Sequence, residues 1–154
     1  MVKINYDETQ ETAYKIDIPE ASADSTTKIT TNDEMFEAIS SLLSSASLEK
    51  GEKIFKKCGS CHSINKDGKS KIGPNLWNLI NKKKASVSGF AYSKALSDYG
   101  GKWTFEELNE FLYKPKEYIK GTKMNFAGLK NVEDRANIIF CLRQQSDNPV
   151  PLPE

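Results

Sequence analysis

The sequence predicts an all-α fold in which helices are joined by long loops. Apolar side chains recur at helical spacing in several stretches, and most of these stretches follow a good N-cap residue. Nothing along the chain shows the paired runs of alternating residues that antiparallel strands require. With 154 residues, 38% of them hydrophobic, the chain is long enough for one domain with extensions.

Charge divides the chain into an acidic first part and a basic remainder. Residues 1–49 contain three Lys and ten Asp or Glu, whereas residues 50–154 contain 19 Lys or Arg and 11 Asp or Glu. Residues 1–32 also have few large apolar side chains, so they cannot bury enough surface to offset the entropy of ordering. We interpret residues 1–32 as an acidic, flexible tether.

Three segments follow this tether. Residues 33–47 are expected to form a short linker helix with Asn32 or Asp33 as its N-cap, and residues 48–146 form a compact domain. Residues 147–154 contain three prolines, which favour a disordered C-terminal tail. The apolar side chains that share one face of the linker helix are Phe36, Ile39, Leu42 and Leu43.

The compact domain opens with a helix at Leu48–Lys57, in which Ile54 and Phe55 face inward. This helix runs directly into a pair of closely spaced cysteines, so its packing also positions their thiols. A second, short helix is expected near Ser93–Tyr99.

Two longer helices have clear start signals. Thr104 and Glu107 form a capping box, in which Thr104 caps the helix and Glu107 reaches back to its first residue. This helix stops before Pro115, because the residue that precedes a proline disfavours helical geometry. Asn131 caps the last helix, where acidic residues in the first turn suit the helix dipole.

The stretch from Cys58 to His62 reads Cys-Gly-Ser-Cys-His, which is the C-x-x-C-H attachment signature of a c-type haem. Two thiols about one helical turn apart can each add to one vinyl group of the same porphyrin. The adjacent histidine then lies against the ring and can ligate the iron. We therefore expect residues 48–146 to hold one covalent haem c through Cys58 and Cys61, with His62 as an axial ligand.

A structural zinc site is the alternative interpretation of these residues. Such a site needs about four ligands, and beyond Cys58, Cys61 and His62 the chain offers only the distant Cys141. Haem is therefore favoured. Once two cysteines hold haem, Cys141 has no partner for a disulfide, and we expect it to lie reduced in a helix core.

The second axial ligand is not a histidine, because His62 is the only one in the sequence. Met1 is terminal and Met35 falls in a helical pattern, whereas Met124 lies in a loop bracketed by glycines. Lys123 is an alternative, since a deprotonated lysine can bind ferric iron, although losing its proton at neutral pH costs free energy. Met124 is favoured, and a His/Met ligand pair raises the reduction potential of a haem.

Short segments spread over about residues 50–145 carry a family pattern: Cys58–His62, Gly73–Leu76, Gly89–Tyr92, Trp103, Pro115–Lys116, Gly121–Met124 and Arg135–Ala136. They resemble class I cytochrome c, and most closely the membrane-anchored respiratory cytochromes c of bacteria related to mitochondria. The acidic arm resembles the tether of those proteins. The resemblance implies a class I cytochrome c fold, with helices and long loops wrapped around one covalent haem.

This resemblance also implies roles around the haem. The carbonyl of Pro74 would accept a hydrogen bond from His62, which fixes the orientation of the imidazole. Tyr92 and Trp103 would donate hydrogen bonds to a haem propionate. Three more side chains would complete the haem pocket: Phe111, Thr122 and Phe126.

A set of lysines would surround the exposed haem edge and dock onto acidic partner surfaces, where charge mainly raises the association rate. The run Lys82–Lys84 is interpreted instead as a solvated basic turn. The acidic arm has an alternative role, in which it folds back on the lysines and competes with partners, but a solvated spacer is the simpler interpretation. The docking lysines are Lys57, Lys71, Lys116, Lys123 and Lys130.

The function that the resemblance implies is a one-electron carrier of a respiratory chain. It would accept electrons from a cytochrome bc1-type complex and deliver them to a haem-copper oxidase, through transient electrostatic docking. It would not be an enzyme, would act as a monomer and would bind no nucleic acid. The alternative is a haem peroxidase or gas sensor with a displaceable sixth ligand, but the chain has no second histidine for acid–base catalysis.

The expected location is the periplasmic side of the bacterial inner membrane. No apolar run in the sequence approaches the roughly 20 residues that span a bilayer, and no secretory signal precedes the domain. Covalent haem attachment in bacteria takes place outside the cytoplasm. We therefore expect that a membrane-anchoring or export segment precedes Met1 in the full-length protein.

Overall fold

The structure, a computed structural model, describes residues 36–154. The predicted tether, Met35 and the N-cap expected at Asn32 or Asp33 lie outside these residues. The described part is all-α, as predicted, and contains one isolated bridge between Lys83 and Lys102 but no strand. Its helices are α1 (Ser40–Leu43), α2 (Leu48–Phe55), α3 (Lys94–Tyr99), α4 (Phe105–Tyr113), α5 (Pro115–Tyr118) and α6 (Val132–Gln144).

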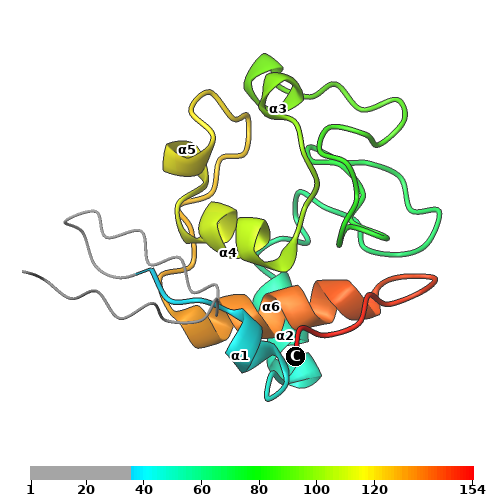
Figure 1. Cartoon of the computed structure of the whole chain (residues 1–154). Coiled ribbons are helices and arrows are strands. Elements are labelled where there is room, and N and C mark those ends of the chain that lie inside the picture. The colour runs from blue at the N-terminus through cyan, green and yellow to red at the C-terminus, as the bar shows by residue number, and fades with distance from the viewer. Residues whose placement is uncertain (1–35) are drawn as a thin grey trace, which may run out of the picture. The chain divides into compact units, whose positions relative to one another are not determined.

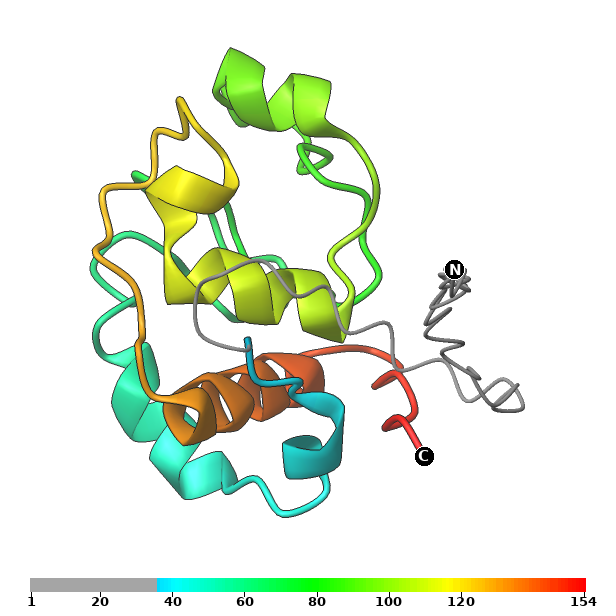
Figure 2. The same cartoon turned by 60° about the vertical axis from the view of Figure 1, so that its left-hand side comes forward.

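Helices α2 and α6 pack against each other, and α4 crosses beside α6, while α3 and α5 lie towards the other end of the domain (Figure 1, Figure 2). Gly51 allows the close approach of α2 to α6. A Cβ atom at this position would overlap the carbonyl oxygen of Asn137 and the Cβ of Cys141. The long loops between α2 and α3 and between α5 and α6 enclose the remaining side of the core. Within residues 36–154, no helix is both long and apolar enough to cross a membrane.

The predicted linker helix is wrong in length. Of residues 36–47, only the four of α1 are helical, and Ile39 and Leu43 are fully buried in the core of the domain. The carboxylate of Glu106 accepts hydrogen bonds from the backbone N–H groups of Ile39 and Ser40, both at 3.1 Å, and from the Ser40 hydroxyl at 2.8 Å. Because a side chain of α4 satisfies these donors, the start of α1 needs no local N-cap side chain.

The start signals of the other helices are largely confirmed. Thr104 accepts a hydrogen bond from the backbone N–H of Glu107, and Asn131 accepts one from that of Asp134. Helix α4 ends before Pro115, as predicted. The same proline begins α5, which the sequence reading missed, because a proline at the first helical position loses no hydrogen bond. Helix α2 ends at Phe55, two residues earlier than expected.

The predicted capping box is wrong in its second bond, the one from the Glu107 side chain back to Thr104. Instead of reaching back to Thr104, the Glu107 carboxylate accepts a hydrogen bond from the Lys84 ammonium at 2.8 Å. Lys84 is only 2% exposed, and its ammonium lies over the rings of Tyr99 and Trp103. The interpretation of this lysine as part of a solvated turn is therefore wrong, since two aromatic faces and one carboxylate compensate its burial.

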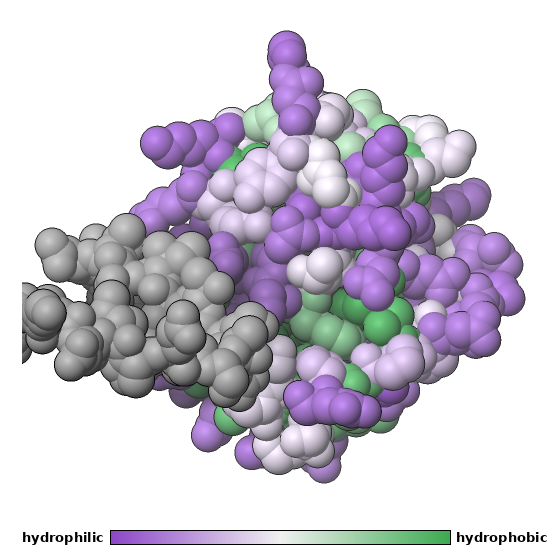
Figure 3. Space-filling model, in the orientation of Figure 1, coloured by the Kyte–Doolittle hydropathy of each residue, from purple (hydrophilic) through white to green (hydrophobic). Residues whose placement is uncertain are grey.

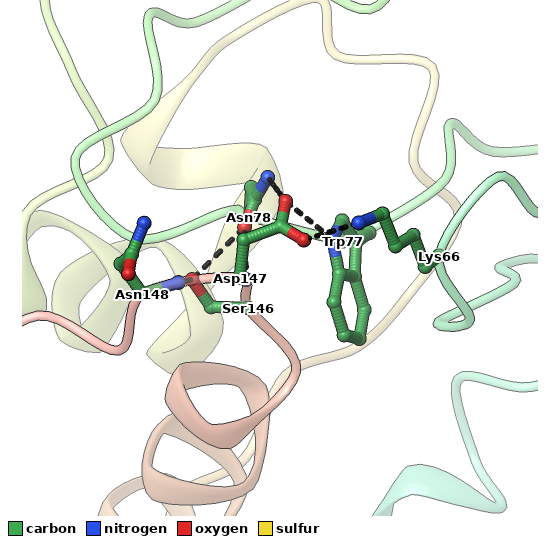
Figure 4. Close-up of polar contacts among 6 residues, drawn as sticks. All are labelled: Lys66, Trp77, Asn78, Ser146, Asp147 and Asn148. Atoms are coloured by element: carbon green, nitrogen blue, oxygen red, sulfur yellow. Dashed lines mark hydrogen bonds and ion pairs between the residues drawn. The ribbon is translucent and has the colours of Figure 1, made fainter.

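The prediction of a disordered tail at residues 147–154 is wrong. The Arg143 guanidinium donates to the carbonyl of Val150 at 2.5 Å, and Val150 and Leu152 pack against the core. The Asp147 carboxylate accepts hydrogen bonds from three side chains, as Figure 4 shows. The prolines prevent regular structure here, but these side-chain contacts hold the segment in place. The three donors to Asp147 are Lys66, Trp77 and Asn78.

The buried ion pair yields a stability prediction. Changing Glu107→Gln leaves the Lys84 charge in place without its counter-charge, which for a fully buried pair costs about 3–5 kcal/mol. Because 32% of the Glu107 side chain is exposed, we expect a loss of roughly 1–3 kcal/mol in the free energy of unfolding, measured by chemical denaturation. Glu110→Gln, an exposed position on the same helix, is the control and should change stability by less than about 0.5 kcal/mol. Equal effects of the two changes would contradict a stabilising role for the pair.

A second prediction concerns pH. Hydrogen bonds from Lys66, then Asn78 and Trp77, lower the pKa of Asp147 from its ordinary 3.8 to about 2. A carboxyl with a lowered folded-state pKa contributes stability above its unfolded value and loses that contribution as the pH falls through the folded value. The stability difference between the wild type and Asp147→Asn should therefore be constant above about pH 5 and shrink between pH 4 and 2. Urea titrations at several pH values would measure it, and a difference that is independent of pH would refute the assignment.

Candidate haem-binding site

The attachment motif continues the helical turns beyond α2. The N–H groups of Cys61 and His62 donate to the carbonyl of Cys58 at 3.0 and 2.9 Å, and the N–H of Cys58 donates to the carbonyl of Phe55 at 2.8 Å. These bonds place the two thiols about one turn apart on a rigid backbone. Both cysteines are half-buried, free and line one cavity.

The imidazole of His62 has a fixed orientation. Its Nδ1 lies 2.7 Å from the carbonyl oxygen of Pro74. Because a carbonyl only accepts, Nδ1 carries the proton and Nε2 keeps its lone pair. Gly73 packs against the ring, and a Cβ there would overlap it. Burial lowers the pKa of His62, an effect that the bond to Pro74 only partly opposes, so the imidazole favours the neutral form that binds metals.

A cavity of about 290 Å³ lies beside the motif, with mostly apolar walls. Leu76, Leu79 and Leu96 come from the loops and α3, Leu108 from α4, and Ile138 from α6. All the predicted attachment, axial and pocket residues line this one cavity: Cys58, Cys61, His62, Pro74, Tyr92, Trp103, Phe111, Thr122, Met124 and Phe126.

The donor set fits a haem. Two thiols, an imidazole nitrogen and a thioether sulfur all line one apolar cavity, and these are the groups that attach and ligate a c-type haem. The zinc alternative finds no support, since residues 36–154 contain no cluster of three His, Cys, Asp or Glu side chains suited to a metal ion. Cys141 is buried in α6 as predicted, and burial raises the pKa of its thiol to about 11.

The loop before α6 presents Met124 to the cavity. The N–H of Met124 donates to the hydroxyl of Thr122 at 3.2 Å, and Gly121 provides the positive φ of 92° that begins this turn. The neighbouring Lys123 also lines the cavity, but its ammonium donates to the carbonyl of Ala91 at 3.3 Å. The Lys123 ammonium is therefore engaged with a backbone carbonyl, and Met124 stays the predicted ligand.

Two aromatic residues of the pocket have defined surroundings. The hydroxyl oxygen of Tyr92 accepts a hydrogen bond from the N–H of Val87 at 2.9 Å, which leaves its own O–H to donate. Burial raises the pKa of Tyr92, so the phenol keeps this proton. Trp103 is buried and packs on Phe111 with ring centroids 4.9 Å apart. The side chains of Tyr92 and Trp103 therefore line the cavity in fixed orientations.

The docking lysines are only partly gathered at the cavity. Lys57 and Lys123 line it, and Lys71 donates to the carbonyl of Gly59 within the attachment motif at 2.9 Å. Lys116 and Lys130 are exposed but do not line it. Lys82 and Lys83 also line the cavity. Sequence reading missed that Lys83 does so and that Ile72, another lining residue, is 81% exposed.

The surface in Figure 3 is mostly hydrophilic, apart from a hydrophobic area near the middle of this face. Among the residues that line the mostly apolar cavity are Lys57, Lys82, Lys83 and Lys123.

Comparison with known proteins gives a consistent result. A family model described as cytochrome c matches residues 48–146. A cytochrome c homolog of Bradyrhizobium diazoefficiens is 43% identical over 118 residues, which are 76% of this chain and 64% of that protein. A cytochrome c homolog of Rickettsia prowazekii is 46% identical over 105 residues, which are 68% of this chain and 60% of that protein. The chain thus spans somewhat less than two thirds of the length of these two relatives.

A eukaryotic relative matches as well. Cytochrome c of Chlamydomonas reinhardtii is 48% identical over 98 residues, or 63% of this chain and 88% of that protein. Together with the helices of residues 36–154, these matches confirm the predicted class I cytochrome c fold. The chain therefore belongs to the cytochrome c family and binds haem c covalently through Cys58 and Cys61.

Proposed function

We propose that this protein is a one-electron carrier of a respiratory chain, which accepts electrons from a cytochrome bc1-type complex and delivers them to a haem-copper oxidase. Membership of the cytochrome c family supports electron transfer. The observation that carries the proposal is that His62 and Met124 line the same apolar cavity as the attachment cysteines. A haem with both axial positions filled exchanges electrons without binding a substrate.

Each part of the chain has a distinct task in this mechanism. The haem, when bound, supplies an iron that gains and loses one electron. Cys58 and Cys61 would hold the haem covalently, and His62 and Met124 would ligate its iron. The apolar walls exclude water, so little reorganisation accompanies the change of charge. Burial favours the neutral imidazole of His62, and its hydrogen bond to Pro74 would keep the ring in one orientation in both oxidation states.

A peroxidase or gas sensor is the competing function. Such a protein needs an exchangeable iron position with an acid–base group beside it. In this chain His62 is the only histidine. Histidine is the side chain whose ordinary pKa best suits acid–base catalysis at neutral pH, and the proposed ligation of the iron already uses this one. We therefore favour a carrier that is not an enzyme.

Partner binding follows from the charge around the cavity. Lys57, Lys82, Lys83 and Lys123 line it, and these cations suit transient docking to acidic surfaces. Lys71, Lys116 and Lys130 would extend this surface. The bacterial relatives support a haem domain outside the cytoplasm, and we propose a monomeric domain at the periplasmic side of the inner membrane, held there by a preceding anchor and bound to no nucleic acid.

The axial assignment predicts the effect of removing the thioether. Met124→Ala should abolish the methionine–iron charge-transfer band of the ferric protein, because no sulfur is left to bind the iron. Carbon monoxide should then bind the reduced protein at least about tenfold faster, since no endogenous ligand has to leave. Lys123→Ala is the matched control in the same loop and should keep the band. Absence of the band from the unchanged protein and its appearance in Lys123→Ala would assign the iron to lysine instead, and rapid binding of carbon monoxide by the unchanged protein would favour the gas sensor.

The docking surface predicts a dependence on salt. Oxidase turnover should fall steeply as ionic strength rises from about 10 to 200 mM, because exposed charges are screened over about 10 Å at 0.1 M. Lys57→Ala should lower the rate at low salt by roughly two- to tenfold and flatten this dependence. Lys53→Ala removes the same charge one turn earlier, where the lysine already pairs with Glu49 at 2.8 Å, and should have a smaller effect. A rate that does not respond to salt would contradict electrostatic docking.

A further inference from the structure

The loop that follows the attachment motif carries the hydrogen-bond partner of the axial imidazole. Residues 63–78 contain no helix or strand, yet their Pro74 supplies the carbonyl that accepts from His62. A loop without regular structure fluctuates unless its own polar groups hold it. The position of the Pro74 carbonyl therefore depends on what fixes this loop.

Hydrogen bonds within residues 63–78 fix part of this loop. The N–H of Leu76 donates to the carbonyl of Ser63 at 2.9 Å. The side-chain amide of Asn75 donates to the hydroxyl of Ser63 at 2.8 Å and to the carbonyl of Asn65 at 3.0 Å. These bonds close the loop on itself, but they do not connect it to the helices that form the walls of the cavity.

The connection to the helices runs through the residues at the end of α6. The Asp147 carboxylate accepts from Lys66 at 2.6 Å, from Asn78 at 2.8 Å and from the Trp77 indole at 3.2 Å (Figure 4). The side-chain oxygen of Asn78 accepts in return from the backbone N–H of Asp147 and from the hydroxyl of Ser146, both at 2.9 Å. We call the contacts of Asp147 and Ser146 with Lys66, Trp77 and Asn78 the C-terminal clasp.

The C-terminal clasp holds the loop on both sides of Pro74. Lys66 precedes this proline and Trp77 and Asn78 follow it, so one carboxylate fixes both arms of the loop. The backbone N–H of Asn78 adds a bond to the carbonyl of Gln145 at 3.0 Å. Asp147 itself lies one residue beyond the part of the chain that the cytochrome c family model matches.

We propose that Asp147 is a positioning residue for the axial ligand: by fixing both arms of the 63–78 loop to the end of α6, it holds the Pro74 carbonyl against the Nδ1–H of His62. This inference rests on the proposed ligation of iron by His62. A firmly held Nδ1–H···O bond makes the imidazole a stronger donor to iron, which stabilises the ferric state. Loss of the C-terminal clasp weakens this bond and raises the reduction potential.

The test separates positioning from the mere loss of a surface charge. Asp147→Ala removes the carboxylate and its charge. Asn78→Gly removes the other half of the clasp without changing the charge, and glycine accepts the positive φ of 58° at this position. Asp98→Ala is the matched control, since it removes an exposed aspartate that pairs with Lys94 on α3.

The main measurement is the exchange of the His62 Nδ1–H proton with solvent, followed by NMR in the reduced, haem-loaded protein. Loss of one or two net hydrogen bonds should accelerate it roughly 5- to 30-fold in both Asp147→Ala and Asn78→Gly, with little change in the amides of α2 and α6. The midpoint potential should rise in both variants, and in Asp147→Ala by more than in Asp98→Ala.

Two outcomes would overturn the inference. One is wild-type exchange of the His62 proton and a wild-type potential in Asn78→Gly, together with equal potential shifts in Asp147→Ala and Asp98→Ala. The other is equal acceleration of all amides, which indicates global destabilisation only. Failure of the proposed function is distinct from both, because it would show as the absence of His/Met ligation in the spectrum of the unchanged protein.

Discussion

The hydrogen bond between the imidazole of His62 and the carbonyl of Pro74 is the interaction on which the haem site depends. Two thioether bonds fix the edge of a porphyrin, but they do not set the rotation of the adjacent ring. That rotation is set by a backbone acceptor at 2.7 Å and by the absence of a side chain at Gly73. The same bond decides which ring nitrogen carries the proton and leaves the other for the iron.

Helices and loops contribute different parts of the haem site. Helices α2 and α4 both pack against α6, and α4 and α6 supply apolar walls such as Leu108 and Ile138. The residues expected to ligate iron lie outside regular elements, His62 just after α2 and Met124 in the loop before α6. This division is common, because a rigid scaffold can position loop residues that do the chemistry. Here it means that the loops need fixed ends, and side-chain contacts with α6 and the residues after it provide them.

What the sequence predicted well is local in the chain. The attachment motif, the candidate ligand Met124 and the caps Thr104 and Asn131 all follow from signals within a few residues, and the first two gain specificity from the limited number of histidines and methionines. These residues stand where the prediction placed them, either on a helix start or on the wall of one cavity.

The features that sequence reading missed depend on partners far away in the chain. Glu106 caps α1 from 66 residues away, and Lys84 pairs with Glu107 across 23 residues. Asp147 binds Lys66 across 81 residues. The sequence near a charged residue does not show which distant residue it pairs with. Local signals therefore favoured a capping box at Glu107 and a solvated turn at Lys84, and they missed the ion pair between the two. The tail was predicted to be disordered because its sequence does not show the contacts that Lys66 and Arg143 make with it.

The capping of α1 by Glu106 determines how mechanical force on the N-terminal segment enters the domain. On α4, Leu108 and Phe111 line the cavity, whereas Glu106 and Asn109 bind the backbone of residues 37–40. At about 100° per residue these two pairs lie on well-separated faces of the helix. A pull on the chain before Phe36 therefore acts on α4 through the face that carries Glu106 and Asn109, and not through the face that lines the cavity.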